Sequence, residues 1–239
     1  MIKLRNTLVA AIAIATLTIS SVLAGNFGVG ISLKSMSVDS SGTETDGTST
    51  GASATDASVR TKSLSETANV GSYYLEYSTE AASWASEGNG WTIGFESMPG
   101  KANLSGKSLS RIDTSEGKGA AGDASGVSNF SAQAQIDNHS NIYVEIPLYS
   151  MLYIKAGQSS LDVISDETVS TDHGTYGNAS VDGMNYGIGV KGMIGSNIKW
   201  KAAFEETDYD TLTIKSSTNN QIKADLDTSE FNISLGYQF

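Results

Sequence analysis

The feature that most constrains the fold of this chain is a regular alternation of apolar and polar residues after Gly25. From Phe27 to Leu33, for example, large apolar residues alternate with glycine and serine. Successive side chains of a strand point to opposite faces, so this period predicts strands with one apolar and one polar face. The alternation occurs at about residues 27–34, 72–78, 91–96, 130–148, 152–156, 184–194, 198–205 and 231–239. The chain is therefore expected to be all-β.

The connections between these stretches alternate between long and short. The short ones lie at about 80–89, 148–151 and 195–197. The long ones are mostly polar and lie at about 39–69, 98–128, 165–182 and 206–230. Long loops at one end and short turns at the other are typical of outer-membrane barrels. We predict an up-and-down antiparallel transmembrane β-barrel of eight strands with both termini in the periplasm. Ten strands are the alternative, if 98–128 contains a further hairpin.

The first 24 residues have the pattern of a secretory signal peptide. Lys3 and Arg5 precede a short apolar run, and the segment closes on the small residues of Val22–Ala24. The apolar run is too short and too rich in Ser and Thr for a spanning helix. We therefore predict a cleaved signal peptide at 1–24, export of the protein, and one barrel domain at 25–239.

Charges of both signs lie on the polar face of the predicted strands. A closed lumen needs such a balance, because a buried charge without a partner is costly. The predicted lumen charge network comprises Lys34, Glu76, Glu96, Glu145, Lys155, Lys191, Lys199, Lys201 and Glu205. Side chains can fill the interior of an eight-stranded barrel, so we expect a plugged lumen in which Lys155 pairs with Glu145 or Glu96.

Aromatic residues concentrate on the apolar face. Several fall at the ends of stretches next to the short turns, where an interfacial girdle belongs. The predicted periplasmic girdle comprises Phe27, Tyr77, Trp91, Trp200 and Phe239. An exported soluble β-sandwich, the alternative fold, would bury this face.

The last stretch ends in Phe with apolar residues at alternate positions: Phe231, Ile233, Leu235, Tyr237 and Phe239. It resembles the C-terminal assembly signal of bacterial outer-membrane proteins. The chain from 25 to 239 resembles the small opacity-like, OmpA-type eight-stranded barrels, with stretches similar to porin-family barrels at 143–147, 152–157 and 223–227. The resemblance implies a location in the outer membrane and recognition of the terminal strand by the barrel-assembly machinery.

Catalytic chemistry has few candidates in this sequence. The absence of Cys excludes thiol catalysis and disulfides. Ser140 follows His139 directly, so in a strand the two side chains point to opposite faces. His173 lies near acidic residues, but no spacing there specifies a protease. We expect no enzyme, no cofactor and no metal site.

The expected function is that of a non-enzymatic surface protein, structural or interacting, with a filled lumen. The alternatives are a narrow porin-like pore and a barrel enzyme that acts on lipid or peptide. The expected partners are outer-membrane lipid, the assembly machinery and an unknown external ligand at the loops. Fifteen basic and 26 acidic residues, a net charge of −11, argue against nucleic acid.

Overall fold

A computed structural model describes residues 25–45, 59–103, 109–114, 127–168, 175–216 and 220–239. The predicted signal peptide and His173 lie outside these residues. The strands are β1 (Gly25–Thr45), β2 (Val59–Thr79), β3 (Thr92–Met98), β4 (Ala102–Asn103), β5 (Leu109–Thr114), β6 (Val127–Tyr149), β7 (Leu152–Thr168), β8 (Ala179–Ile194), β9 (Ile198–Tyr209), β10 (Leu212–Lys215) and β11 (Gln221–Gln238). The described residues contain no helix that is long and apolar enough to span a membrane.

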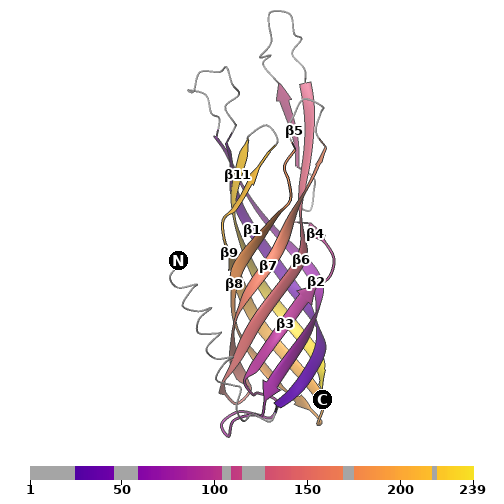
Figure 1. Cartoon of the computed structure of the whole chain (residues 1–239), viewed down its shortest axis with the longest axis vertical. Helices are drawn as coiled ribbons and strands as arrows, with labels where there is room; N and C mark the ends of the chain where they lie inside the picture. Colours follow the sequence, from indigo (N-terminus) through magenta and orange to yellow (C-terminus); the bar gives the residue numbers. More distant parts are fainter. Residues whose placement is uncertain (1–24, 46–58, 104–108, 115–126, 169–174, 217–219) are drawn as a thin grey trace, which may run out of the picture.

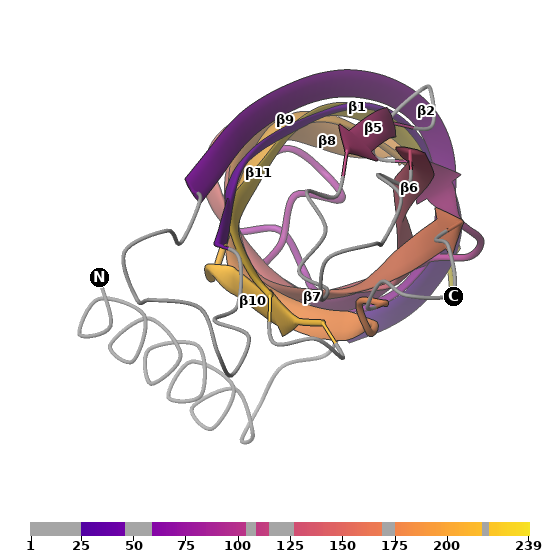
Figure 2. The ribbon, with the colours of Figure 1, turned by 90° about the horizontal axis from the view of Figure 1, so that it is seen from above.

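Eight strands form a closed antiparallel ring, as the sequence predicted. Their order is β1, β2, β3, β6, β7, β8, β9 and β11, and β11 pairs back with β1 (Figures 1 and 2). The short strands β4 and β5 pair with β6 and β10 pairs with β11, so they add no strand to the ring. The ten-stranded alternative is therefore not adopted.

The two ends of the barrel differ. At one end lie the short β6–β7 and β8–β9 turns, together with Phe239, whose N–H donates to the Phe27 carbonyl. We call this the turn end and the opposite one the loop end. At the turn end Ser150 and Gly195 adopt positive φ, as tight turns between antiparallel strands require.

The strands extend much further towards the loop end than the sequence predicted. Residues 39–69 were expected to be a loop, yet β1 continues to Thr45 and β2 begins at Val59. The same holds for parts of the expected loops at 98–128, 165–182 and 206–230. These segments lack the apolar outer face that marks the other stretches, but backbone pairing does not require it. The barrel is consequently long and narrow (Figure 1).

Candidate functional site

Large apolar side chains cover the outside of the barrel near the turn end. Ile31, Leu33 and Phe204 have exposed fractions of 63%, 72% and 65%. The band, which we call the apolar band, includes Phe27, Val29, Ile31, Leu33, Tyr73, Leu75, Phe95, Ile142, Ile154, Tyr186, Ile188, Phe204, Phe231, Ile233, Leu235, Tyr237 and Phe239. From Phe231 to Phe239 it is roughly 20 Å tall, for strands tilted by about 40°. A soluble sandwich would bury these residues, so the chain is a transmembrane barrel.

The predicted girdle residues lie on this outer face near the turn end. Phe27, Trp91 and Phe239 are exposed, and Tyr77 and Trp200 are partly exposed. The rings of Phe27 and Tyr77 meet edge to face with centroids 5.2 Å apart. The five residues thus share the outer face near the turn end, and their role as an interfacial girdle stays a prediction.

Ten charged side chains fill the lumen behind the apolar band. All nine predicted charged residues are buried there, and Glu230 joins them. We call these ten residues the lumen network. They comprise five lysines and five glutamates, so the charges balance among the described residues. Glu230 was missed because it directly precedes the predicted terminal strand, whereas β11 begins at Gln221.

Ion pairs divide the lumen network into two groups. In the first, Lys34 bridges Glu96 and Glu230 at 3.0 and 2.9 Å, and Lys155 contacts Glu205 at 2.7 Å and Glu96 at 3.6 Å. In the second, Lys201 bridges Glu76 and Glu145, while Lys199 contacts Glu76 and Lys191 contacts Glu145, both at 2.7 Å. The first group has two lysines and three glutamates, a net charge of −1. The second group has three lysines and two glutamates, a net charge of +1, so the two net charges cancel.

The sequence predicted the partner of Lys155 only in part. Lys155 lies opposite Glu145 in the β6–β7 register. Its Nζ nevertheless contacts Glu205 and Glu96, while Glu145 binds Lys191 and Lys201. Glu145 is therefore not its partner. A long side chain in a narrow lumen reaches across to other strands, which the pairing of neighbouring strands does not reveal.

Buried tyrosines pack between the two groups. The Nζ of Lys155 lies 4.2 Å from the ring centroid of Tyr143, and that of Lys201 lies 5.5 Å from the same ring. Lys201 also lies 4.6 Å from the ring of Tyr74. The void between these side chains is about 10 Å³, the space of one water molecule. The lumen is therefore filled at this level.

Residues 80–91, which connect β2 to β3, close the mouth at the turn end. Asn89 is fully buried, and its Nδ2 donates to the carbonyls of Ser150 and Leu152 at 2.6 and 3.1 Å. Lys191 on β8 donates to the Gly90 carbonyl at 2.9 Å. The segment thus reaches from β2 across to β7 and β8. The sequence predicted a simple turn here.

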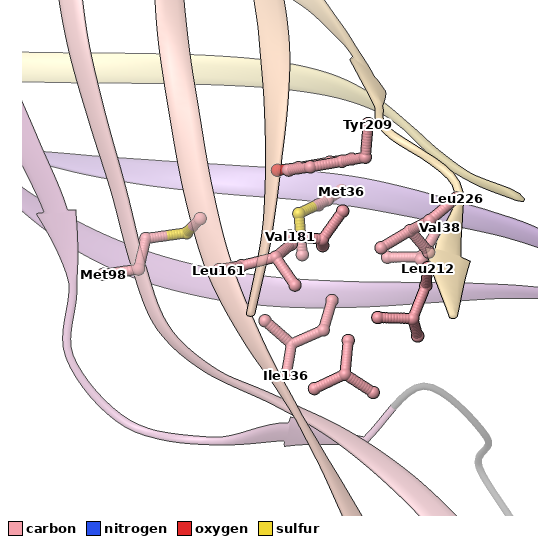
Figure 3. Close-up of a cluster of buried hydrophobic side chains, with 10 residues drawn as sticks. Met36, Val38, Met98, Ile136, Leu161, Val181, Tyr209, Leu212 and Leu226 are labelled. Carbon is pink, nitrogen blue, oxygen red and sulfur yellow. The ribbon is translucent and has the colours of Figure 1, made fainter. Parts of the chain in front are cut away.

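Above the lumen network the interior becomes apolar. The close-up in Figure 3 shows side chains from several strands gathered inside the barrel. This apolar tier comprises Met36, Val38, Met98, Ile136, Leu161, Val163, Val181, Tyr209, Leu212 and Leu226. The outer face at this level is polar, with Ser35, Ser37 and Asp39 on β1. This half of the barrel has the inside and outside of a water-soluble protein.

The strands make this inversion in two ways. On β1 the same positions keep facing inward, but Lys34 is followed by Met36 and Val38. On β6 a bulge between Asp137 and Ser140 exchanges the faces, with Asn138 at φ 51°. His139 and Asn141 are buried below the bulge and Ile136 above it. One extra residue in a strand reverses the facing of everything beyond it.

His139 and Ser140, the catalytic candidates within the described residues, lie on opposite faces of β6. The Nε2 of His139 lies 3.0 Å from the Tyr209 hydroxyl, and Ser140 faces outward. No group of three or more His, Asp or Glu residues within the described ranges is arranged to hold a metal ion. His139 is a buried polar side chain below the apolar tier.

Carboxylates on the outer face form a row above the apolar band. Asp227 on β11 lies directly opposite Asp39 on one side and Asp208 on the other. Desolvation, followed by the charges of Asp208, Asp225 and Asp39, raises the pKa of the Asp227 carboxyl. Like charges directly opposite each other destabilise a sheet.

This row predicts a pH dependence of stability. A raised pKa means that the folded protein binds the proton more tightly than the unfolded chain does. The contribution of Asp227 to stability should therefore increase as the pH falls from neutral, through the folded pKa, towards 3.8, the ordinary pKa of an aspartate. Asp227→Asn should stabilise the barrel at neutral pH and reduce this increase. Urea titrations from pH 7 to pH 4 would measure both effects, with Ser229→Ala as the control. Equal pH dependence in Asp227→Asn and the parent protein would contradict the prediction.

The predicted assembly residues Phe231, Ile233, Leu235, Tyr237 and Phe239 all point outward from the terminal strand β11. β11 closes the ring against β1, from Gly28↔Gln238 to Thr45↔Gln221. Recognition of these residues by the assembly machinery stays a prediction.

Removal of Phe239 should separate folding from assembly. The deletion removes one exposed side chain and one terminal hydrogen bond, and the ladder of β11 with β1 and β9 remains. Loss of one such side chain costs only about 1.5–3 kcal/mol. We expect the truncated protein to refold in detergent, with normal heat-modifiable migration, but to assemble poorly in cells. Normal assembly in cells would remove the argument for an assembly signal.

Comparison with known proteins gives similarity of fold only. No protein-family model matches the sequence, and no curated protein matches it. Among solved structures, the outer membrane protease OmpT from Escherichia coli is 10% identical with a TM-score of 0.43, covering 92% of this chain and 99% of that one. OprG from Pseudomonas aeruginosa is 14% identical with a TM-score of 0.39, covering 91% and 97%. Neisserial surface protein A is 8% identical with a TM-score of 0.35, covering 90% and 99%.

Proposed function

We propose that this protein is a non-enzymatic outer-membrane barrel that raises its loop end above the outer leaflet as a surface for interactions. In this proposal the turn end and both termini lie in the periplasm. The partners are outer-membrane lipid, the barrel-assembly machinery during biogenesis, and an external ligand at the loop end.

The observation that carries the proposal is the continuation of the barrel beyond the apolar band. From Leu33 to Thr45, β1 rises about 30 Å above that band at a strand tilt of about 40°. The outer face of β1 is polar over this length, and the lower part of it, at Met36 and Val38, encloses the apolar tier. A lipid-embedded plug would not need this part. Its physical effect is to hold the loop end in water, away from the lipid surface.

The contents of the lumen oppose the narrow-pore alternative. A solute would have to pass residues 80–91, the lumen network and the apolar tier in succession. The charged side chains of the network are at most 5% exposed, and each is paired. The apolar tier would add a dehydrated barrier to ions.

Conductance measurements test this directly. Refolded protein in a planar bilayer should show no stable single-channel steps at moderate voltage, because ions find no continuous polar path. The refolded protein added to the bilayer should show the heat-modifiable migration of a folded barrel, which controls for a failure to fold. Reproducible steps of one size would favour the pore.

The orientation needs its own experiment. The chain has no cysteine, so single cysteines report without background. Ser41→Cys on the outer loop-end part of β1 should react with an impermeant maleimide on intact cells. Ser196→Cys in the β8–β9 turn should react only after the outer membrane is opened. The reverse labelling pattern would overturn the proposed orientation.

A further inference from the structure

The wall of the barrel is split from the upper margin of the apolar band towards the loop end. β2 pairs with β3 only from Tyr73 to Ser78, and β3 ends at Met98. Pro99 and Gly100, the latter at φ 98°, break the strand. The chain then continues as β4 and β5, which pair with β6 and not with β2. From Val59 to Ser72, β2 is thus paired on one side only, with β1, within the described residues.

The register identifies which backbone groups point into the split. The N–H of Thr79 donates across to the Trp91 carbonyl before β3. The pairing of β2 with β1 is continuous without a bulge, so alternate residues from Thr79 upward face the same side. Their N–H and C=O groups therefore point into the split at Gly71, Asn69, Thr67 and Ser65. The residues between them use their backbone groups to pair with β1.

The part of this edge at residues 63–72 lacks the devices that usually protect an exposed strand, whereas Arg60 and Lys62 lie at its upper end. Proteins guard such edges with Pro, Lys, bulges or very short strands. Residues 63–72 contain no Pro, Lys or Arg, and the single charged residue, Glu66, is partly buried and opposite Val38. The segment is also long and regular. Among the described residues, a row of β2 backbone groups therefore has no strand partner at the side of the barrel.

We propose that this edge of β2 binds an extended polypeptide segment of another protein by strand addition. A row of donors and acceptors at strand spacing is complemented by another strand. Lipid does not fit beyond Gly71, which lies opposite Leu33 at the upper margin of the apolar band, because the next edge positions lie opposite the polar residues of β1 from Ser35 to Asp39. The outward residues Ser65, Thr67 and Asn69 are polar, whereas Val70 packs against the apolar tier. A matching segment would alternate polar residues outside with apolar residues inside.

This inference rests on the proposed function, since the edge meets a partner in water only if the loop end is outside the cell. It names the site and the class of partner for the surface interaction. The two proposals fail separately: a conducting pore would refute the plugged lumen, whereas the state of the β2 edge is read from its own amides.

Amide hydrogen exchange of the refolded full chain in detergent provides the first test. The amides of Ser65, Thr67, Asn69 and Gly71 should exchange at least about tenfold faster than those of their neighbours Glu66, Ala68 and Val70, because only the latter are paired. A synthetic peptide that copies residues 35–45 of β1, a strand that β2 already pairs with, should slow exchange at the four exposed amides. The same peptide with alternate N-methyl groups should have no effect.

A pair of variants isolates the backbone contribution. Thr67→Pro removes a donor that the barrel does not use, so it should leave the fold intact but weaken peptide binding by about tenfold or more. Thr67→Ala keeps the donor and should bind as the parent does. Equal protection of all amides without peptide, or equal binding by Thr67→Pro and Thr67→Ala, would overturn the proposal. Protection that appears only with rising protein concentration would do the same, since it would identify a second copy as the occupant.

Discussion

Lys34→Ala should lower the free energy of unfolding by about 3–5 kcal/mol, because it removes one partner from a buried ionic network. Lys34 is the lysine that contacts Glu230, and it also contacts Glu96. Without it, Lys155 alone remains among three glutamates in the first group of the lumen network. Glu230 is then a buried carboxylate without a cation.

The position of a lysine in the lumen network, and not its burial alone, should set the size of the loss. Lys201→Ala leaves Glu76 paired with Lys199 and Glu145 paired with Lys191, so its cost should be smaller than that of Lys34→Ala. Urea titrations of refolded barrels would rank the variants, with the exposed Lys223→Ala as control. Adding Glu230→Gln to Lys34→Ala should restore part of the stability. Equal losses for Lys34→Ala, Lys201→Ala and Lys223→Ala would refute the balanced lumen network.

Leu161→Ala should cost about 2–5 kcal/mol, the range for truncating a fully buried leucine. Leu161 is 1% exposed inside the apolar tier. The loss should be confined to the loop-end half, because the lumen network lies below it. Hydrogen exchange should therefore accelerate in the upper parts of β1, β7 and β8, while the same strands within the apolar band stay protected. The matched control is Ser160→Ala, whose side chain faces outward on the same strand. A uniform loss of protection throughout the barrel would show that the two halves unfold as one unit.

The alternation of the sequence was sufficient to predict the ring and the contents of its lower half. Each stretch from Phe27 to Phe239 has a single apolar face, and the charges on the other face are few and mixed in sign. Because lipid reverses the usual arrangement, those charges had to be inside. Contacts such as Lys34 with Glu96 were not predictable, since they depend on how side chains from non-adjacent strands meet in the lumen.

The loop-end half was missed although its signal is present. Met36 and Val38 face inward on β1, as Ser32 and Lys34 do. The apolar residues, which face outward up to Leu33, therefore face inward beyond it. When apolar residues are sought only at alternate positions of one face, a change to the other face looks like the end of the strand. On β6 the phase does not reverse at all, because the bulge at Asn138 exchanges the faces. The closure by residues 80–91 was missed for a different reason: it depends on Asn89 and Gly90 meeting β7 and β8, far along the sequence.

The inversion of faces along a single strand also bears on the accuracy of pairing. If β1 shifted by one residue against its neighbours, Lys34 would turn towards lipid and, two positions on, Met36 would turn towards water. The same shift would thus cost free energy in both media, because lipid favours apolar side chains outside the barrel and water favours polar ones. A barrel with an ordinary polar exterior beyond the membrane could tolerate misalignment there. In this chain no such tolerant segment exists between Phe27 and Val38, so the first strand admits one alignment over its membrane and aqueous parts alike.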